Sequence, residues 1–360
     1  MSVFDHPEFD QHESIHHFSD RATGLKAIIA IHSTVLGPAA GGCRRWRYDS
    51  GAEALSDALR LSRGMTYKNA VAGLPFGGGK AVILADEQTR NSSQLFAAFG
   101  RAVDSLDGRY VTAEDVGVTV DDMRLVRRET EYVSGLPQSG ESAGGDPSPW
   151  TALGVFLGIE AAAQTRLGTD SLKGLRIAVQ GVGNVGRHLC RLLHRAGARL
   201  VIADLNLRNL MRLRAEIPVS EVPVSEILYA HVDILAPCAL GNVLNAETIP
   251  RIRAKVIAGA ANNQLSTDGD GARLAKRGIL YAPDYVINAG GIVSCTREYL
   301  GQSSEEEVRA EVGRIPERLL ALFSEAKATA KPTNILADEL ARRLVAGSTA
   351  TESAANHRIA

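Results

Sequence analysis

The chain has 360 residues but only four cysteines, Cys43, Cys190, Cys238 and Cys295. They are widely and irregularly spaced, so they match neither a disulfide framework nor the paired cysteines of a metal site. The sequence therefore predicts four reduced thiols, which are typical of a cytoplasmic protein, and no bound metal.

Long apolar runs and an excess of one charge are also missing. No window approaches the roughly eighteen uninterrupted apolar residues of a membrane-spanning helix, and the N-terminal residues MSVFDHPEFDQHESIHH lack the basic and apolar segments of a signal peptide. Lysine and arginine number 40 against 41 aspartate and glutamate, a formal net charge of -1. Such a surface has no bulk attraction for polyanions. We expect neither a membrane nor a nucleic-acid partner.

A glycine-rich stretch that ends in a lysine, GLPFGGGK at residues 73–80, lacks two features of a P-loop. Leu74 stands where that motif requires its first glycine, and Ala81 follows Lys80 where a Ser or Thr would hold magnesium. The stretch therefore does not predict a cradle for a nucleoside triphosphate. The role of Lys80 has to be inferred from the rest of the chain.

The first part of the chain alternates between strand and helix patterns. Runs of β-branched residues predict strands, and apolar residues at helical spacing predict helices. The glycine-rich stretch is expected to form a loop, and Ser92 to cap the second helix. In chain order the expected elements are a strand at 25–35, a helix at 51–70, a strand at 81–84, a helix at 92–106 and a strand at 109–115.

A connection rich in glycine and proline, residues 135–149, separates this part from the next and predicts a hinge. Because 360 residues exceed the roughly 250 to 300 at which one core usually divides, we expect two domains, with limits 1–140 and 141–330. Beyond the connection, short apolar runs alternate with helical stretches, which predicts an α/β fold with a doubly wound parallel sheet covered on both faces. The tail from Ser303 is expected to be helical with a break at Pro316.

A dinucleotide site is predicted by GVGNVG, residues 181–186, which follows the apolar strand RIAVQ and opens an amphipathic helix. The three glycines permit a tight turn, the approach of a pyrophosphate and close packing of helix on strand. Asp204 ends the next strand, where its carboxylate can bind the adenosine ribose hydroxyls and repel a 2′-phosphate. This favours NAD over NADP, although Arg208 could hold a phosphate instead.

Hydride chemistry with a nicotinamide requires polar groups that handle the substrate, and three candidates stand in the first domain: Lys68, Lys80 and Asp115. One lysine can bind a substrate carboxylate. The other, partly desolvated and near a like charge, can exchange protons. Glycines beside Lys80 would let a flat substrate lie against the backbone, and Asp115 adds a second acid/base group. As ordinary solvated side chains these residues would have no function. However, a charge without a function is unfavourable at a lysine between glycines and an apolar strand.

Seven segments resemble, in order and spacing, the amino acid dehydrogenases that act on glutamate, leucine, phenylalanine and valine, and most of all the leucine-specific members. The resemblance extends from about Phe9 to the C-terminal helices. It implies reversible, NAD-dependent oxidative deamination of an L-amino acid to a 2-oxo acid and ammonia. The segments are GLKAIIAIHSTVLGPAAGGCR, RGMTYKNAVAGLPFGGGKAV, VTAEDVG, VQGVGNVG, APCALGNVLN, GAANNQL and APDYVINAGGIV.

The resemblance also implies roles for individual residues. Lys68, helped by Asn288, would bind the substrate α-carboxylate; Lys80 would activate the water that adds to the iminium carbon, and Asp115 would move protons to and from the amino nitrogen. The substrate would also lie against Ala40, Gly41, Gly42, Met65, Ala113 and Cys295. The dinucleotide would contact Gly181, Val182, Gly183, Asn184, Val185, Gly186, Asp204 and Thr151, with Ser148 and Asn262 near the nicotinamide.

Two of these positions bear on specificity. The glutamate-specific relatives have a lysine in the place of Ala40 and a serine in the place of Cys295, and these two residues serve the side-chain carboxylate of glutamate. Without them, burying a second carboxylate is costly, so the substrate should be apolar, with leucine and other branched-chain amino acids favoured. Ala40 is smaller than the aliphatic residue usual in the leucine enzymes, which leaves a phenylalanine- or tryptophan-type enzyme as the alternative.

Other functions stay open on the sequence. A regulatory protein could bind NAD with this fold and have lost the chemistry, although such a protein has no need of Lys68, Lys80 and Asp115 together. A 2-hydroxy acid dehydrogenase is less favoured, because no His and Arg pair suited to that chemistry can be placed. By resemblance we expect a homo-oligomer assembled through the first domain, with the C-terminal helices from about 330 to 360 packed back on it.

The pentapeptide HESIH, residues 12–16, matches the zinc motif HExxH. That motif places both histidines on one helix, whereas no sustained amphipathic pattern and no third ligand accompany these residues. By the family resemblance, His16 and His17 belong to an outer strand, and we expect no zinc there.

Overall fold

The computed structural model describes residues 2–85, 93–136, 146–239, 241–301 and 304–356, with side chains described as far as residue 347. The chain divides into two compact units. The first comprises residues 1–145, 295–303 and 341–360, and the second residues 146–294 and 304–340. Each unit contains its own sheet, so the predicted α/β fold with two domains is confirmed.

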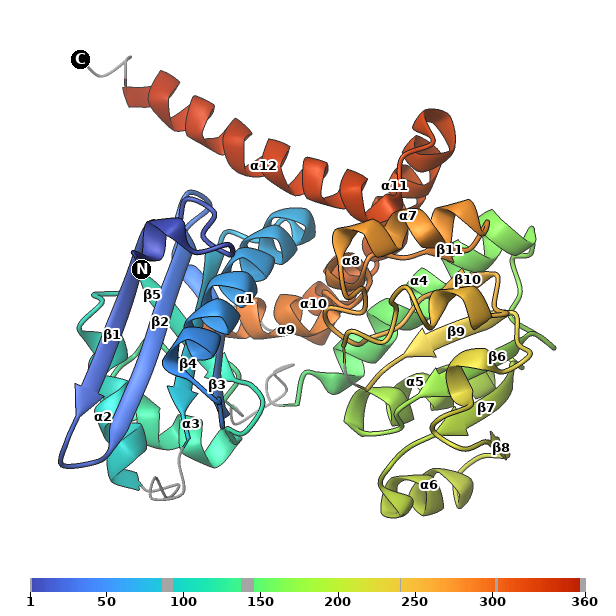
Figure 1. The fold of residues 1–360 in the computed structure, drawn as a ribbon, viewed down its shortest axis with the longest axis horizontal. Helices are drawn as coiled ribbons and strands as arrows, with labels where there is room; N and C mark the ends of the chain where they lie inside the picture. The colour runs from blue at the N-terminus through green and yellow to red at the C-terminus, as the bar shows by residue number, and fades with distance from the viewer. Residues whose placement is uncertain (1, 86–92, 137–145, 240, 302–303, 357–360) are drawn as a thin grey trace. The chain divides into compact units, whose positions relative to one another are not determined.

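The first unit is built on a five-stranded mixed sheet (Figure 1). Strands β1 and β2 form an antiparallel pair, β2 is antiparallel to β4, and β3 is parallel to both β4 and β5. Strand β1 is at an edge of the sheet, so the outer strand expected for His16 and His17 is confirmed. The strand order is β1 (Ser14–Asp20), β2 (Leu25–Ser33), β4 (Gly77–Leu84), β3 (Ala39–Trp46) and β5 (Tyr110–Glu114).

Helices cover both faces of this sheet (Figure 1). Helix α1, Gly51–Ala72, packs on one face, where Ala54, Ala58 and Leu59 meet apolar residues of β2 and β4. On the other face, α2 (Ser93–Asp104) and α3 (Val120–Arg127) bury an apolar cluster against the sheet. The Ser50 hydroxyl caps the start of α1 by accepting from the Glu53 amide. Ser92, predicted as the cap of α2, lies outside the described residues.

The prediction of a glycine loop before residue 81 is wrong, because Gly77, Gly78 and Gly79 are part of β4. A Cβ on Gly77 would overlap with the Ser33 carbonyl, and one on Gly78 with the Thr66 backbone of α1. A Cβ on Gly79 would come within 2.7 Å of the Tyr110 ring. The glycines therefore let α1 and the neighbouring strands approach β4 closely. Lys80 follows them on the same strand, so it lies within the sheet and not on a loop.

The second unit contains a six-stranded, all-parallel sheet in the order expected of a dinucleotide-binding fold (Figure 1). The chain enters at the central strand β6, moves outward through β7 and β8, returns to β9 beside β6, and ends with β10 and β11. This order creates a switch point between β6 and β9, where such sheets bind their ligands. The strands are β6 (Arg176–Gln180), β7 (Arg199–Ala203), β8 (Ser220–Glu221), β9 (Ile234–Pro237), β10 (Val256–Ile257) and β11 (Leu280–Tyr281).

Apolar residues on both faces of the strands explain why helices cover both faces of this sheet, as predicted. Ala178, Val201 and Leu235 belong to a cluster that includes residues of the flanking helices on one face, and their strand neighbours, such as Ile177 and Val179, are fully buried on the other. The α-helices of this unit are α4 (Ser148–Leu167), α5 (Asn184–Arg195), α6 (Leu207–Arg214), α7 (Asp268–Lys276), α8 (Asp284–Ile287), α10 (Glu305–Val312) and α11 (Ile315–Thr329).

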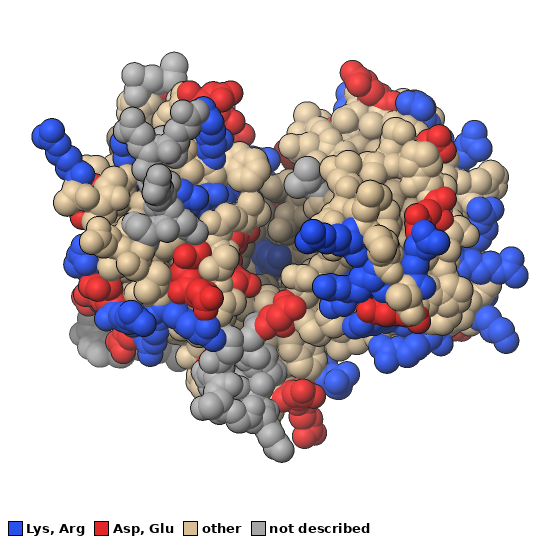
Figure 2. All heavy atoms as spheres, turned by 90° about the horizontal axis from the view of Figure 1, so that it is seen from below, with Lys and Arg blue, Asp and Glu red and all other residues tan. Residues whose placement is uncertain are grey.

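Two helices contribute to both units, α9 (Gly290–Tyr299) and α12 (Thr333–Asn356). The break expected at Pro316 is confirmed, since α10 ends at Val312 and Pro316 lies in the first turn of α11. Most of the predicted hinge, residues 137–145, lies outside the described residues. In the part of the chain that the structure describes, no helix combines the length and the apolar composition of a membrane span. The face drawn in Figure 2 carries charged side chains of both signs.

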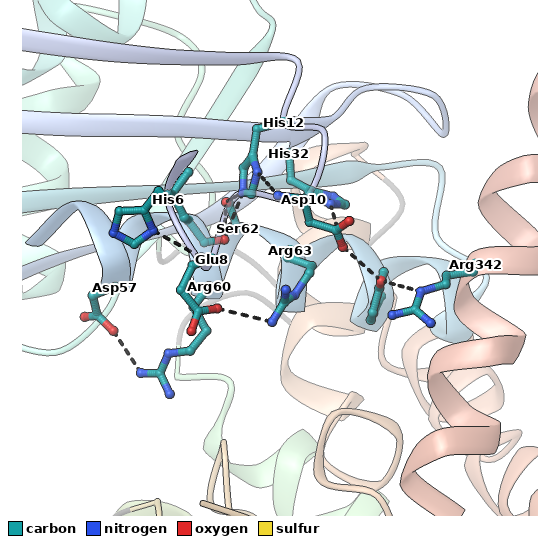
Figure 3. A network of polar contacts seen from close by, with 12 residues as sticks. His6, Glu8, Asp10, His12, His32, Asp57, Arg60, Ser62, Arg63 and Arg342 are labelled. Carbon is teal, nitrogen blue, oxygen red and sulfur yellow. Dashed lines mark hydrogen bonds and ion pairs between the residues drawn. The ribbon is translucent and has the colours of Figure 1, made fainter. Parts of the chain in front are cut away.

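A polar network joins the N-terminal segment, β2 and α1 in the first unit (Figure 3). The His12 ring nitrogen Nε2 lies 3.0 Å from the Leu59 carbonyl oxygen and 3.1 Å from Ser62 Oγ. His32 Nδ1 lies 2.8 Å from Thr66 Oγ1, and the two imidazoles meet edge to face at 4.8 Å. The buried His12 and the half-buried His32 thus tie the N-terminal segment and β2 to α1.

The network continues through Tyr67 to Arg342 of α12, which Figure 3 labels. The Tyr67 hydroxyl lies 3.5 Å from Asp10 Oδ2 and accepts a hydrogen bond from Arg342 Nε at 3.0 Å. The Asp10 carboxylate in turn lies 3.9 Å from His32 Nε2. Arg342, well inside α12, is therefore linked to Tyr67 of α1 and through it to Asp10.

Acid should weaken this network. Burial, and then the charge of His12, lower the pKa of His32 from 6.5 to about 4. Between these values the unfolded chain binds a proton that the folded chain does not, so the free energy of unfolding falls as pH drops from 6.5 to 4. At roughly 1.4 kcal/mol per pKa unit the expected loss is about 3 kcal/mol. Urea denaturation across this range should show it.

His32→Gln should remove much of this pH dependence, whereas His17→Gln, at an exposed position on β1, should leave it intact. Equal slopes for wild type and His32→Gln would contradict the assignment.

Candidate active site

Lys80 and Asp115 form a close ion pair in the first unit. Lys80 lies within β4 and is only 5% exposed. Asp115 follows β5 directly, and its Oδ2 lies 2.5 Å from Lys80 Nζ. A buried ammonium without a partner would cost several kcal/mol, so this carboxylate stabilises the charge where the strand places it. The structure therefore brings together the two residues predicted to carry the chemistry.

The Asp115 carboxylate is strongly ionised in this arrangement. Burial would raise its pKa, but the charge of Lys80 and then that of Arg44 outweigh burial and lower the pKa to about 2. Arg44 Nε lies 3.3 Å from the same oxygen, Oδ2. At neutral pH this group can accept a proton but holds none to give.

The glycine pair of β3 lies beside this ion pair. A Cβ on Gly42 would come within 2.9 Å of the Asp115 Cβ, and one on Gly41 would overlap with the Gly79 carbonyl and lie 3.2 Å from Met65 Cγ. The Gly41 carbonyl accepts a hydrogen bond from the Tyr110 hydroxyl at 2.6 Å. Backbone, rather than side chain, thus borders the region around Lys80.

The remaining substrate residues predicted in this unit lie on the same elements. Ala113 pairs with Gly42 across β5 and β3. Lys68 is half-buried on α1, two residues after Thr66, which contacts β4 at Gly78. Because β4 alternates, Gly78 and Lys80 share the sheet face that α1 covers. Lys80 therefore lies on the sheet face that α1 covers, and Lys68 is carried by α1 itself.

Ala40 lies in a small apolar cluster. It is 7% exposed and packs with Phe76 and Val111, against which Tyr299 also packs. The Phe76 and Tyr299 rings meet at 5.8 Å in an edge-on arrangement. Cys295 lies one turn before Tyr299 on α9, and its Sγ would be 3.9 Å from a Cβ on Gly135.

The glycine loop of the second unit follows β6 and opens α5 as predicted. Gly181 has a φ of +90°, and a Cβ there would come within 2.7 Å of Ala239. A Cβ on Gly186 would overlap with the Gly181 carbonyl, whereas one on Gly183 would meet no described atom within 4 Å. No side chain caps α5 at Gly183. Open backbone and uncapped amides at a helix start suit a pyrophosphate.

Asp204 is tied to this loop. Its Oδ2 accepts from the Val182 amide at 2.8 Å and from Asn209 Nδ2 at 3.3 Å, and its Oδ1 accepts from the Asn206 amide at 2.7 Å. The carboxylate thus holds the glycine loop against the end of β7. Asn184 and Val185 form the first turn of α5.

Four further predicted residues lie in the second unit. Asn288 Nδ2 donates to Asn262 Oδ1 at 2.7 Å and to the Ala260 carbonyl at 3.0 Å, and Asn288 Oδ1 has no hydrogen-bond partner among the described residues. Its amide therefore offers an acceptor, whereas the predicted help in binding a carboxylate needs a donor.

Ser148 and Thr151 form the first turn of α4, where a Cβ on Gly291 would lie 2.5 Å from Thr151 Oγ1.

Family comparisons decide the kind of enzyme. A family profile described as Glu/Leu/Phe/Val dehydrogenase, dimerisation domain, matches residues 12–132. A second, Glutamate/Leucine/Phenylalanine/Valine dehydrogenase, matches residues 146–206 and 207–351. The chain belongs to the Glu/Leu/Phe/Val dehydrogenase family. The predicted family and the amino acid dehydrogenase activity are thereby confirmed, and membership implies a nicotinamide cofactor.

Individual members of the family match over nearly the whole chain. Leucine dehydrogenase of Geobacillus stearothermophilus is 48% identical over 346 residues, which cover 96% of this chain and 94% of the relative. Valine dehydrogenase of Streptomyces albus is 46% identical over 346 residues, 95% of this chain and 94% of the relative. The crystal structure of L-tryptophan dehydrogenase from Nostoc punctiforme superposes with a TM-score of 0.81 at 45% identity, covering 94% and 97% of the two chains.

Sequence reasoning missed several residues that the structure places around the family's site. Arg44 contacts Asp115, and Phe76 and Tyr299 pack beside Ala40. Arg44 stands two residues after the glycine pair on the same strand, which is a usable signal once that pair is assigned to the substrate. Phe76 and Tyr299 carried no signal, because their contact joins distant segments.

The HESIH segment does not form a metal motif. His12 bonds to α1, as described above, whereas His16 Nε2 lies 2.9 Å from Ser14 Oγ on β1. In the described part of the chain, no three His, Cys, Asp or Glu side chains gather as ligands for an ion. The two imidazoles serve the fold.

Proposed function

We propose that this enzyme catalyses the reversible, NAD-dependent oxidative deamination of an apolar L-amino acid, leucine or another branched-chain amino acid, to the 2-oxo acid and ammonia. The observation that carries the proposal is the buried Lys80–Asp115 pair, bordered by the bare backbone of Gly41 and Gly42, in a chain of this family. We assign residues 1–140 to substrate binding and oligomerisation and residues 141–330 to NAD binding, with the C-terminal helices from about 330 packed on the first domain.

Three residues of this chain have separate roles in the proposed reaction. Lys68 binds the α-carboxylate by charge and sets the α-carbon beside Lys80. Asp115, ionised at neutral pH, accepts a proton from the substrate ammonium. Lys80, in the amine form left after its own proton has gone to solvent, then takes a proton from the water that adds to the iminium carbon, and Asp115 returns its proton to the departing amino group. Bound nicotinamide supplies the two-electron oxidation.

An apolar side chain fits the residues near Ala40. The side chains of Ala40, Phe76 and Val111 are apolar, so a second carboxylate placed against them would lose hydration without gaining a partner from these three residues. The small side chain of Ala40 and the 45% identity to an L-tryptophan dehydrogenase favour aromatic amino acids as the second candidate class. A methylene more or less discriminates by only about 1 to 3 kcal/mol, so several apolar substrates should react.

A substrate panel tests the proposal. Absorbance at 340 nm should rise with NAD and leucine, valine, isoleucine, phenylalanine or tryptophan, and kcat/KM should be highest for a branched-chain amino acid. Glutamate should react at least about 100-fold more slowly, in keeping with the cost of an unpaired buried charge. A glutamate rate equal to that of leucine would refute the apolar assignment, and an optimum on phenylalanine or tryptophan would select the second class.

Lys68→Ala should chiefly weaken amino acid binding. Loss of a charge-assisted contact to the α-carboxylate is expected to raise the KM for the amino acid about 100-fold, with a smaller change in kcat and an unchanged KM for NAD. Steady-state kinetics on purified protein measures both. A normal KM for the amino acid would remove Lys68 from its assigned role.

Asp204→Ala should relax the preference for NAD. Removal of the carboxylate takes away the repulsion of a 2′-phosphate, so the ratio of kcat/KM with NADP to that with NAD is expected to rise about 10-fold or more. The rate with NAD should fall as well, because the Val182 amide loses its acceptor. If the ratio stays constant here but falls in Arg208→Gln, then Arg208 decides the preference.

We further propose a homo-oligomer built through the first domain and a cytoplasmic location. The match of residues 12–132 to a profile described as a dimerisation domain supports the first point. The wide spacing of four cysteines supports the second.

A further inference from the structure

Arg44 is the second cation on the Asp115 carboxylate. It extends from β3, and its Nε donates to Asp115 Oδ2 at 3.3 Å. Lys80 Nζ donates to the same oxygen at 2.5 Å. The Val116 backbone amide also donates to this carboxylate, but no side-chain donor among the described residues contacts Oδ1. The two cations therefore share one oxygen, and neither of them occupies the other.

A second carboxylate holds Arg44 in place. Asp57 of α1 accepts from Arg44 Nη1 at 2.9 Å and from the Tyr48 hydroxyl at 2.7 Å, both on Oδ2. Its Oδ1 accepts from Arg60 Nη2 at 3.0 Å, a contact drawn in Figure 3. The side chains of Arg44 and Asp57 are 23% and 12% exposed. The planar guanidinium thus bridges two carboxylates through separate nitrogens, which fixes its plane.

The two cations differ in what they can do during a reaction. A lysine ammonium sits on a flexible stem and can lose its proton, whereas a guanidinium stays charged at every accessible pH. When Lys80 gives up its proton or turns toward water, Asp115 loses that partner. Arg44 cannot leave in the same way, because Asp57 holds its other nitrogen.

We propose that Arg44, anchored by Asp57, is a positioning residue that holds Asp115 Oδ2 throughout the reaction and so presents Oδ1 to the amino nitrogen of the substrate. The proposal rests on the role given above to Asp115. It adds a fixed cation to a reacting pair that would otherwise lose its geometry each time Lys80 changes its charge.

Replacement of Arg44 separates this role from a structural one. Arg44→Gln removes the charge and the fork of donors, so the carboxylate is free to rotate. We expect kcat to fall about 100-fold, as a misplacement of about 1 Å can cause, with the KM for the amino acid changed less than about threefold. Arg44→Lys, which keeps the charge but not the fork, should recover part of kcat. Arg60→Gln is the matched control, since it removes a guanidinium from Asp57 but not from Asp115.

A titration tests the contact without relying on turnover. In protein labelled with ¹³C at the aspartate carboxyl carbons, Asp115 is identified as the resonance missing from Asp115→Asn. Its pKa, about 2 in the wild type, should rise in Arg44→Gln, because one of two cations is gone, and stay constant in Arg60→Gln. Burial raises the pKa values of the nearby Cys43 and Tyr110, so both stay neutral in this range. Asp57, on the other side of Arg44, also titrates at low pH: burial raises its pKa, but the hydrogen bond from Tyr48 and then the charge of Arg44 outweigh burial and lower it.

The outcomes decide the proposal. A raised pKa and a lowered kcat in Arg44→Gln, with Arg60→Gln unchanged in both, support it. An unshifted pKa in Arg44→Gln overturns it, and so does an equal loss of kcat in Arg60→Gln, which would mean that the network only supports α1. If the wild type oxidises no amino acid, the proposed function fails, and the titration alone then decides whether Arg44 controls Asp115.

Discussion

Replacing Lys80 with alanine is expected to lower kcat for amino acid oxidation about 1,000-fold or more while leaving NADH binding unchanged. The amine lies buried at the end of a glycine run and within 2.5 Å of Asp115, where it can exchange a proton with water at the substrate carbon. Proton transfer by one positioned group is worth about 10² to 10⁴ in rate, and the lost charge adds to this. Stopped-flow measurement of the 340 nm signal and NADH fluorescence titration give the two quantities.

Two further variants sharpen the result for Lys80. Lys80→Arg keeps the charge but cannot release a proton, so it should be nearly as slow as Lys80→Ala. Lys26→Ala, which removes an exposed lysine from β2 of the same sheet, should leave kcat unchanged. Turnover in Lys80→Ala within tenfold of the wild type would take Lys80 out of the chemistry.

Gly78→Ala is expected to have the largest effect on stability. The added Cβ would overlap with the Thr66 amide nitrogen and hydroxyl of α1, and these are backbone and buried atoms that cannot turn aside. Overpacking of this kind costs about 1 to 3 kcal/mol and sometimes more, so we expect a loss of about 3 kcal/mol in the free energy of unfolding. Because α1 carries Lys68, the KM for the amino acid should rise as well. Urea denaturation and steady-state kinetics measure the two effects.

Gly64 supplies the matched control for Gly78. It lies on α1 itself, and a Cβ there would meet no described atom within 4 Å. Gly64→Ala should therefore stabilise the protein by up to about 1 kcal/mol, since alanine favours helix over glycine. Wild-type stability in Gly78→Ala would show that α1 does not pack on β4 as closely as described.

The periodic parts of the fold were predictable from the sequence. Apolar runs, helical spacing and a glycine motif between them predict the parallel sheet, the first turn of α5 and the position of Asp204, because each signal lies within one short segment. The break at Pro316 follows in the same way from the geometry of proline.

The start of β4 was not predictable in this way. Glycine is rare in strands and has no side chain to show alternation, so Gly77, Gly78 and Gly79 indicated a loop. What requires glycine there is the close approach of Thr66, Ser33 and Tyr110, which come from distant parts of the chain.

In the candidate site, too, some residues were predictable from local motifs and others were not. Lys68, Lys80 and Asp115 stand beside recognisable motifs, and the resemblance to a family gave each a role. The contacts of Arg44 with Asp57 and Asp115 join β3 to α1 and to the end of β5. Such contacts depend on the packing of the sheet and helix, which no local pattern in the sequence encodes.

A crystal structure of the wild-type enzyme with NADH and 4-methyl-2-oxopentanoate, in the absence of ammonia, tests the central claim most directly. The account predicts Lys80 Nζ within about 3.5 Å of the ligand's oxo group, close enough for proton exchange at the reacting carbon. Asp115 Oδ2 should still be held by Arg44. A Lys80 amine turned away from the bound ligand, into bulk solvent, would contradict the account.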